Sequence, residues 1–294
     1  MGFFQHVDQY LRDMYTLVSS SMIKRKLRIF FLYNWLVLKN VFSKITSIQF
    51  RRQKFLGYKV DFDNYGSFFA LFTEMFVYNI YYFRSSEKAP FIVDCGGNIG
   101  MSLLYFKYLF PKAHIECYEP DPSTFQLLKK NVEQNKLSSI TLIQKGVSGK
   151  DGKMKFYSYG DMKGGPGNTL LESQVNFKNV QTFDVEVVEL KKENYKKIHF
   201  LKIDIEGAEG FMFDSFKDND FLSLVDNVNL EYHYDIGYDG NKLSPILAVL
   251  EKYQYNVVIN QNTLVAFYTS RSLYRKLDRK YVLLIDCFKD KNHL

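Results

Sequence analysis

Three ionisable side chains at the ends of two apolar runs have the residue types that proton transfer requires. The run "FLKIDIEGAEG" carries Asp204, and the run "VNLEYHYD" carries Glu231 and His233. Glu231 and His233 are two residues apart, so on a strand both point to the same side. A histidine of near-neutral pKa is a suitable general base, and Asp204 or Glu231 can orient it. Alternatively, the same three side chains can hold Mg²⁺, which would acidify a hydroxyl group.

An earlier apolar run breaks into glycine and predicts a ligand site. The run "FIVDCGGNIG" has the pattern D-x-G-x-N-x-G, formed by Asp94, Gly96, Asn98 and Gly100, and a helix is expected after it. Glycine lets the backbone turn sharply and lets a ligand approach without meeting a Cβ. The spacing differs from the G-x-G-x-x-G of dinucleotide-binding proteins. An acid ahead of the glycines suits a cation, such as the ammonium group of S-adenosylmethionine.

Two later segments complete a nucleoside site. The strand-like "HIECYEP" contains Glu119, and a carboxylate at that position can accept hydrogen bonds from both ribose hydroxyls. The turn "GVSG" contains Val147 and Ser148, which are expected to flank the adenine. Glycine loop, acid and turn follow one another in this order at the spacing of a single domain, and together they favour an S-adenosylmethionine site. An NAD enzyme and a sheet without a cofactor are the alternatives.

Strands alternate with helices over the segment that carries these motifs. This pattern predicts an α/β fold with a Rossmann-like, doubly wound, mostly parallel seven-stranded sheet, in which ligands bind at the carboxyl ends of the strands. The expected helices are 99–110, 121–136, 207–216 and 243–253. The expected strands are 91–95, 114–119, 140–144, 199–203, 226–232, 256–260 and 265–269.

The chain divides into three regions by composition. Residues 1–55 form a helical N-terminal extension, residues 56–270 the Rossmann-like domain, and residues 271–294 a C-terminal basic segment of unknown role. Within the domain, residues 57–83 predict a hairpin followed by an amphipathic helix. Residues 149–194 interrupt the alternation of strands and helices, and the glycine-rich stretch 160–168 is expected to form a loop over the site.

Charge and cysteine content indicate where the protein acts. The net charge of +7 comes with basic clusters at 24–28 and 51–54, both in the extension. The extension is therefore a helical cap, a basic amphipathic surface for a membrane, or an arm for a homo-oligomer. The three cysteines have no C-x-x-C spacing, which favours a reducing cytoplasm. We expect a cytoplasmic protein that can be peripheral to the inner face of the membrane.

The chain from about residue 55 to 268 resembles the FkbM-type family of S-adenosylmethionine-dependent O-methyltransferases. The segments "FTEMFVYNIYYF", "VDCGGNIGMSLLYF" and "FLKIDIEGAE" carry the resemblance. The family commonly has a branched aliphatic residue or Ala at the positions of Cys95 and Gly97, and these departures leave the site intact. The resemblance implies a class I methyltransferase fold with the cofactor along Asp94–Gly100 and Glu119. It also implies that Glu74, in a helix like the family's lid, holds the methionine end of the cofactor.

These observations predict an O-methyltransferase that acts on a hydroxyl of a sugar, nucleotide sugar or surface polysaccharide. His233, Asp204 and Glu231 form the expected catalytic set, and Asp204 is also expected to contact the cofactor. An RNA 2′-O-methyltransferase is an alternative because the chain is basic, but no aromatic–basic RNA module is evident, so no nucleic-acid partner is expected. A non-catalytic adenosyl-binding scaffold is the other alternative.

Overall fold

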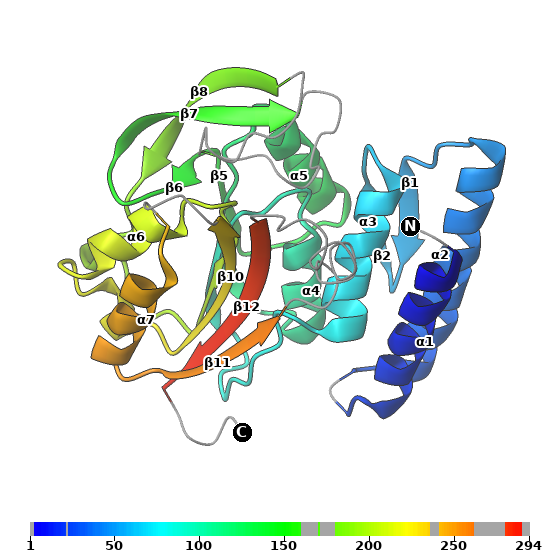
Figure 1. The fold of residues 1–294 in the computed structure, drawn as a ribbon, viewed down its shortest axis with the longest axis horizontal. Helices are drawn as coiled ribbons and strands as arrows, with labels where there is room; N and C mark the ends of the chain where they lie inside the picture. The colour runs from blue at the N-terminus through cyan, green and yellow to red at the C-terminus, as the bar shows by residue number, and fades with distance from the viewer. Residues whose placement is uncertain are drawn as a thin grey trace.

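The centre of the protein is a seven-stranded β-sheet with helices on both faces (Figure 1). The computed structural model describes residues 3–21, 23–159, 170, 180–235, 241–261 and 280–289. The strand order is β11-β12-β10-β9-β3-β4-β5, and every pair is parallel except those that include β12. The strands are β3 (Phe91–Cys95), β4 (His114–Tyr118), β5 (Ile140–Ile143), β9 (Phe200–Ile203), β10 (Asn227–Asp235), β11 (Asn256–Gln261) and β12 (Lys280–Phe288). The predicted doubly wound α/β fold is therefore confirmed.

Two hydrophobic cores lie on opposite faces of this sheet because successive side chains of each strand alternate. In β3, Ile92 belongs to the core that includes Phe106 of the helix α4 (Met101–Leu109), whereas Val93 belongs to the core that includes Met212 of the helix α6 (Glu209–Phe216). The helices that follow the strands are α4 (Met101–Leu109), α5 (Pro122–Gln134), α6 (Glu209–Phe216) and α7 (Leu243–Lys252). All four lie within the ranges that the sequence predicts.

The seventh strand corrects the sequence analysis. The range 265–269, where we expected it, lies outside the described residues. Instead, β12 forms from the segment that we assigned to a separate basic region, and it runs antiparallel between β10 and β11. Ile285 and Cys287 on β12 are buried in the core. Residues 280–288 therefore belong to the domain.

The N-terminal helices pack onto the domain through their own buried side chains. α1 (Phe3–Ser19) and α2 (Lys26–Thr46) precede a hairpin of β1 (Arg52–Phe55) and β2 (Tyr58–Asp61), which spans the boundary expected at residue 55. The helix expected next consists of α3 (Tyr65–Phe72) and the π-helix η1 (Thr73–Tyr78). Tyr33 of α2 and Phe68 of α3 lie in the same core. The buried carboxylate of Asp13 on α1 accepts hydrogen bonds from Tyr33 and from Tyr78 of η1. None of the described helices is both long and apolar enough to cross a membrane.

A small second sheet lies over the end of the main sheet (Figure 1). Its order is β6-β8-β7, with β6 at Gly146–Val147, β7 at Gly152–Tyr159 and β8 at Val180–Val188. β7 and β8 fall within residues 149–194, where the regular alternation was expected to break, and β6 directly precedes this range. The glycine-rich stretch 160–168 lies outside the described residues. Two short 3₁₀-helices, η3 (Lys192–Asn194) and η4 (Phe221–Leu224), connect the remaining elements.

Candidate active site

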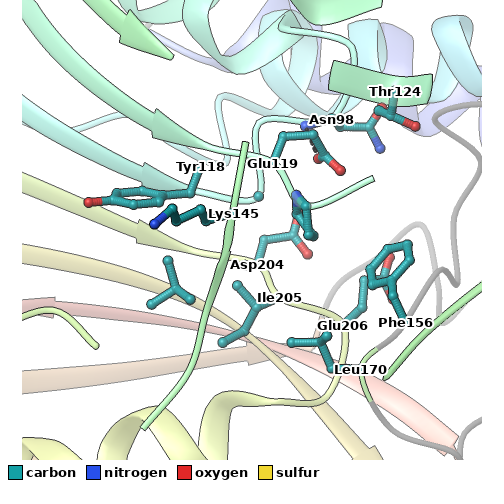
Figure 2. A pocket seen from close by; sticks show the side chains of 14 residues that line it. Asn98, Tyr118, Glu119, Thr124, Lys145, Phe156, Leu170, Asp204, Ile205 and Glu206 are labelled. Carbon is teal, nitrogen blue, oxygen red and sulfur yellow. Dashed lines mark hydrogen bonds between the residues drawn. The ribbon is translucent and has the colours of Figure 1, made fainter. Parts of the chain in front are cut away.

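A pocket opens at the carboxyl ends of β3, β4 and β9, where the strand order reverses (Figure 2). Doubly wound sheets bind their ligands at this position. Figure 2 shows Asn98, Glu119 and Thr124 together on one side of the pocket, with Asp204 between them and Glu206. The lining consists of Gly96, Asn98, Tyr118, Glu119, Pro120, Thr124, Lys145, Gly146, Val147, Phe156, Leu170, Asp204, Ile205 and Glu206. Five of the predicted cofactor residues are therefore in the lining: Gly96, Asn98, Glu119, Val147 and Asp204.

The other four predicted cofactor residues lie outside this lining. Asp94 is fully buried behind the glycine loop, where it pairs with Lys202 at 3.2 Å and accepts a hydrogen bond from Ser102 at 2.5 Å. Gly100 begins α4, and the buried Ser148 contacts the sulfur of Met154 at 3.4 Å. Glu74 lies in η1 and interacts electrostatically with Glu231 and Asp204. Glu74 therefore belongs with the acidic groups beside the pocket.

The glycines of the first motif are required by packing within the protein. Gly96 has φ +101°, and a Cβ on it would lie 2.0 Å from the backbone oxygen of Asp204. A Cβ on Gly97 would lie 2.3 Å from Cys117 Sγ. We expected the glycines to allow a sharp turn and the approach of a ligand, and in the structure the atoms nearest to an added Cβ belong to the protein. The two motif loops can lie this close only because one of them lacks a side chain.

Lys202 connects the two motifs, and the sequence analysis missed it. Its ammonium group donates a hydrogen bond to the Gly96 carbonyl at 2.8 Å and lies 3.2 Å from Asp94 and 3.4 Å from Asp204. Burial opposes the charge on this side chain, but the two carboxylates raise the pKa of Lys202 above its ordinary value. The lysine is therefore a buried cation. A lysine inside an apolar run, as in "FLKI", was the signal in the sequence that could have indicated this buried ion pair.

Glu119 has the geometry expected of a ribose ligand. Its Oε2 accepts the Asn98 backbone N–H at 2.9 Å, and its Oε1 accepts the Asp121 backbone N–H at 3.0 Å. The side chain is buried, and burial raises the pKa of Glu119 to about 8. Each carboxylate oxygen can accept a further hydrogen bond. The side chain therefore fits a pair of ligand hydroxyl groups.

His233 is held by Glu209, an acid that is not among the residues predicted for the site. His233 Nδ1 lies 2.9 Å from Glu209 Oε1. Glu209 is fully buried and also accepts hydrogen bonds from the Gly207 backbone N–H at 2.9 Å and from Asn241 at 2.8 Å. Glu206 Oε2 is 3.4 Å from His233 Nε2. The orienting carboxylate is thus Glu209 rather than Asp204 or Glu231. Its position in the same motif as Asp204 was the signal available in the sequence.

The acidic groups around His233 favour its charged form, whereas a general base must be in its neutral form to accept a proton. Burial opposes the imidazolium form, but the charges of Glu206 and Glu209 raise the pKa of His233 well above its ordinary value. Glu231 accepts a hydrogen bond from the Tyr81 hydroxyl at 2.5 Å, and burial raises the pKa of Glu231 to about 7. The surroundings of His233 therefore favour its protonated form, whereas the pKa of Glu231 lies near neutral pH.

Three of these side chains are also spaced as ligands of one metal ion. One atom from each of Asp204, Glu206 and His233 lies within 4.8 Å of the others. This set differs from the predicted one because Glu206 takes the place of Glu231. Glu209 at Nδ1 leaves His233 Nε2 directed toward Glu206, an arrangement that also occurs around metal-bound histidines.

The sheet order, with its one antiparallel strand, and the pocket with Glu119 at the end of β4 define a class I, S-adenosylmethionine-dependent methyltransferase. The sequence model of the methyltransferase FkbM domain matches residues 94–257. The chain therefore belongs to the FkbM methyltransferase family.

Similar proteins are found in fungi and bacteria. Methyltransferase 1 of Beauveria bassiana is 30% identical over 179 residues, covering 54% of this chain and 70% of that protein. The 2-O-methyltransferase NoeI of Sinorhizobium fredii is 27% identical over 176 residues, covering 55% and 70%. The crystal structure of an FkbM methyltransferase from Methylobacillus flagellatus aligns with a TM-score of 0.44 at 15% identity. That alignment covers 76% of this chain and 54% of the other, so the chain spans about half of that protein's length.

Proposed function

We propose that this protein transfers the methyl group of S-adenosylmethionine to a hydroxyl group of a sugar, nucleotide sugar or surface polysaccharide. The observation that carries the proposal is the set of half-buried ionisable side chains beside the pocket, in which Asp204 interacts with Glu74 and Glu231. Such groups can hold a hydroxylated acceptor and take up its proton. The 2-O-methyltransferase NoeI, a relative at 27% identity, supports oxygen as the acceptor atom.

The lining residues divide into polar and apolar groups that fit the two parts of a nucleoside. Glu119 and Asn98 would bind the ribose, while Val147, Phe156 and Ile205 supply apolar surface for the adenine. When bound, S-adenosylmethionine supplies an activated methyl group. The task left to the protein is to align the acceptor oxygen and to remove its proton.

Glu231 is the group that we propose takes this proton. Its pKa of about 7 suits a base at neutral pH. The Tyr81 hydroxyl donates a hydrogen bond to Glu231 Oε1, which leaves Oε2 for the hydroxyl group that is to be methylated. His233 was the expected base, but the charges of Glu206 and Glu209 raise the pKa of His233 and favour the protonated form, which cannot accept a proton. We assign it to holding Glu206 in place. The alternative, in which Asp204, Glu206 and His233 bind Mg²⁺, is favoured by their spacing alone.

The basic charge of the chain is not concentrated around the pocket. Residues 1–60 contain eleven Lys and Arg against two Asp, a net charge of +9, whereas the whole chain carries +7. The remainder of the chain is therefore slightly acidic. The RNA alternative rested on the basic charge of the chain, and this distribution places that charge away from the catalytic part. It therefore favours a small-molecule or glycan acceptor.

A methyl-transfer assay tests the proposal. The protein is incubated with S-adenosylmethionine labelled in the methyl group and with a panel of nucleotide sugars, oligosaccharides and RNA. We expect an O-methylated carbohydrate by mass spectrometry, and a loss of roughly 10²–10⁴ in rate for Glu231→Gln. The exposed Glu251→Gln is the matched control. Transfer to RNA or to a nitrogen atom would contradict the proposed acceptor, and an active Glu231→Gln would contradict the proposed base.

A further inference from the structure

The outer side of α2 carries an apolar stripe along its full length. The spacing of its members, three or four residues, keeps them on one side of the helix. Their exposed fractions lie between 49% and 78%. On the opposite side, Ile29, Tyr33 and Leu36 are buried in the core, so packing fixes which side faces outward. The α2 stripe consists of Leu27, Phe31, Trp35, Leu38, Phe42 and Ile45.

Exposed apolar side chains are concentrated in this part of the molecule. Of the fourteen large ones in the described part of the chain, twelve lie between residues 7 and 48. α1 contributes Val7, Leu11, Tyr15 and Val18. Figure 1 shows α1 and α2 side by side at one end of the molecule, away from β6, β7 and β8. A concentration of this kind on a water-soluble surface marks an interaction site.

Basic side chains lie at both ends of the α2 stripe. Arg25 and Arg28 are exposed at its beginning and Lys44 is exposed at its end, and α2 contains no acidic residue. The two acids of the first 60 residues are already engaged. Asp13 is buried among hydroxyl donors, and Asp8 forms an ion pair with Arg12 at 3.1 Å. The surface is therefore apolar along its middle and positively charged at its ends.

We infer that the α2 stripe, with the adjacent exposed side of α1, binds the surface of an anionic lipid bilayer. Apolar and aromatic side chains would enter the boundary between headgroups and acyl chains, and the basic ends would contact lipid phosphates. A second copy of the chain fits less well, because a self-complementary contact would bring basic ends together without an acidic partner. This inference does not depend on the identity of the methyl acceptor.

The chain reports on this contact without any label, because Trp35 is its only tryptophan and is 57% exposed. The full-length protein is mixed with vesicles of phosphatidylglycerol and phosphatidylcholine, or of phosphatidylcholine alone. We expect flotation with the anionic vesicles, a blue shift of Trp35 fluorescence, and quenching by lipids brominated on the acyl chain. Flotation without quenching would mean that Trp35 stays outside the bilayer, and would overturn the inference.

Two variants separate the apolar and basic contributions. Leu38→Asp should reduce vesicle binding at least tenfold, and the exposed Ile259→Asp on β11 is the matched control. Arg28→Gln combined with Lys44→Gln should reduce binding about 25-fold, because each basic side chain near an anionic surface contributes about fivefold. Exposed Lys112 and Lys153, changed together to Gln, are the control. Binding of S-adenosylhomocysteine shows that each variant is folded.

Three results would overturn the inference. The first is a wild-type protein that does not bind anionic vesicles and sediments as a monomer. The second is a wild-type dimer that does not bind vesicles and that Leu38→Asp dissociates, since the surface would then join two copies. The third is equal binding to both kinds of vesicle, which would remove the role of the basic ends.

Discussion

Above pH 8, where Glu119 is ionised, replacing it by Gln should weaken the binding of S-adenosylhomocysteine by about 10- to 150-fold. Both carboxylate oxygens of Glu119 are fixed by backbone N–H groups, at 2.9 and 3.0 Å, in a pocket where the side chain is only 7% exposed. A ribose hydroxyl therefore meets a preoriented acceptor. Hydrogen bonds to a charged group contribute about 1.5–3 kcal/mol, and the amide keeps the size of the side chain but removes its charge and one of its two acceptor oxygens.

The pH dependence of binding follows from the pKa of about 8 that burial gives Glu119. Ribose hydroxyls donate hydrogen bonds, so the ligand prefers the ionised carboxylate. Below pH 8 the free protein is mostly protonated at this site, and affinity should rise about tenfold per pH unit until it levels off above pH 8. The same raised pKa disfavours the folded free protein as the pH increases from 4.5, the ordinary pKa of a glutamate, through 8.

Isothermal titration calorimetry between pH 6 and 9 measures both effects. Comparison of buffers with different ionisation enthalpies gives the protons released on binding, which should approach one at pH 7 for the wild type and zero for Glu119→Gln. Glu133→Gln on α5, with a side chain 65% exposed, is the control. A wild-type affinity that is constant over this range, or an unchanged affinity in Glu119→Gln, would refute the assignment of Glu119 to the ribose.

Three other changes test the remaining parts of the site. Glu209→Gln should lower kcat at least tenfold with an unchanged Kd for S-adenosylhomocysteine, because the change releases the imidazole of His233. The exposed Glu193→Gln should change neither quantity. A weaker affinity of Glu209→Gln for S-adenosylhomocysteine would contradict the positioning role. Chelator should leave turnover unchanged if a carboxylate is the base, whereas loss of turnover that Mg²⁺ or Mn²⁺ restores would favour the metal cluster. Gly96→Ala should lower the free energy of unfolding by at least about 2 kcal/mol more than Gly57→Ala, because Gly57 has a similar φ but open space where a Cβ would be. Equal thermal stability of the two variants would contradict the packing argument.

The position of the site could be predicted from sequence because strand ends determine it. In a parallel sheet, apolar runs that stop at an acid or a glycine end at the same edge, so Glu119 and Asp204 could be assigned to one pocket from their places in the chain. The register between β3 and β9 pairs Asp94 with Lys202, and this pairing brings the two motifs together. The local sequence pattern and the geometry of the sheet therefore predict the same position for the pocket.

Side-chain roles were harder to predict because they depend on partners distant in sequence. Asp94 was predicted to contact the cofactor, but it forms an ion pair with Lys202, which lies 108 residues later in the chain. His233 looked like a base because its ordinary pKa is near neutral, but Glu206 and Glu209 raise that pKa. β12 was missed because its basic flanks resemble those of a tail, although Leu284 and Ile285 lie in a continuous apolar run. In each case tertiary contacts outweighed a local pattern.

The close contact between the loops after β3 and β9 explains why the first motif needs glycine at position 96. Asp204 N–H donates to the Cys95 carbonyl at 3.0 Å, and both Gly96 and Gly97 donate to the Tyr118 carbonyl, so the ends of β3, β4 and β9 are joined by backbone hydrogen bonds. Neighbouring strands lie about 4.8 Å apart, which leaves no room for a side chain at Gly96 beside the Asp204 carbonyl. Methyl transfer depends chiefly on alignment of the acceptor oxygen with the methyl carbon. Because the cofactor loop and the acidic loop are joined in this way, a group held by one is positioned relative to the other without further ordering of the chain.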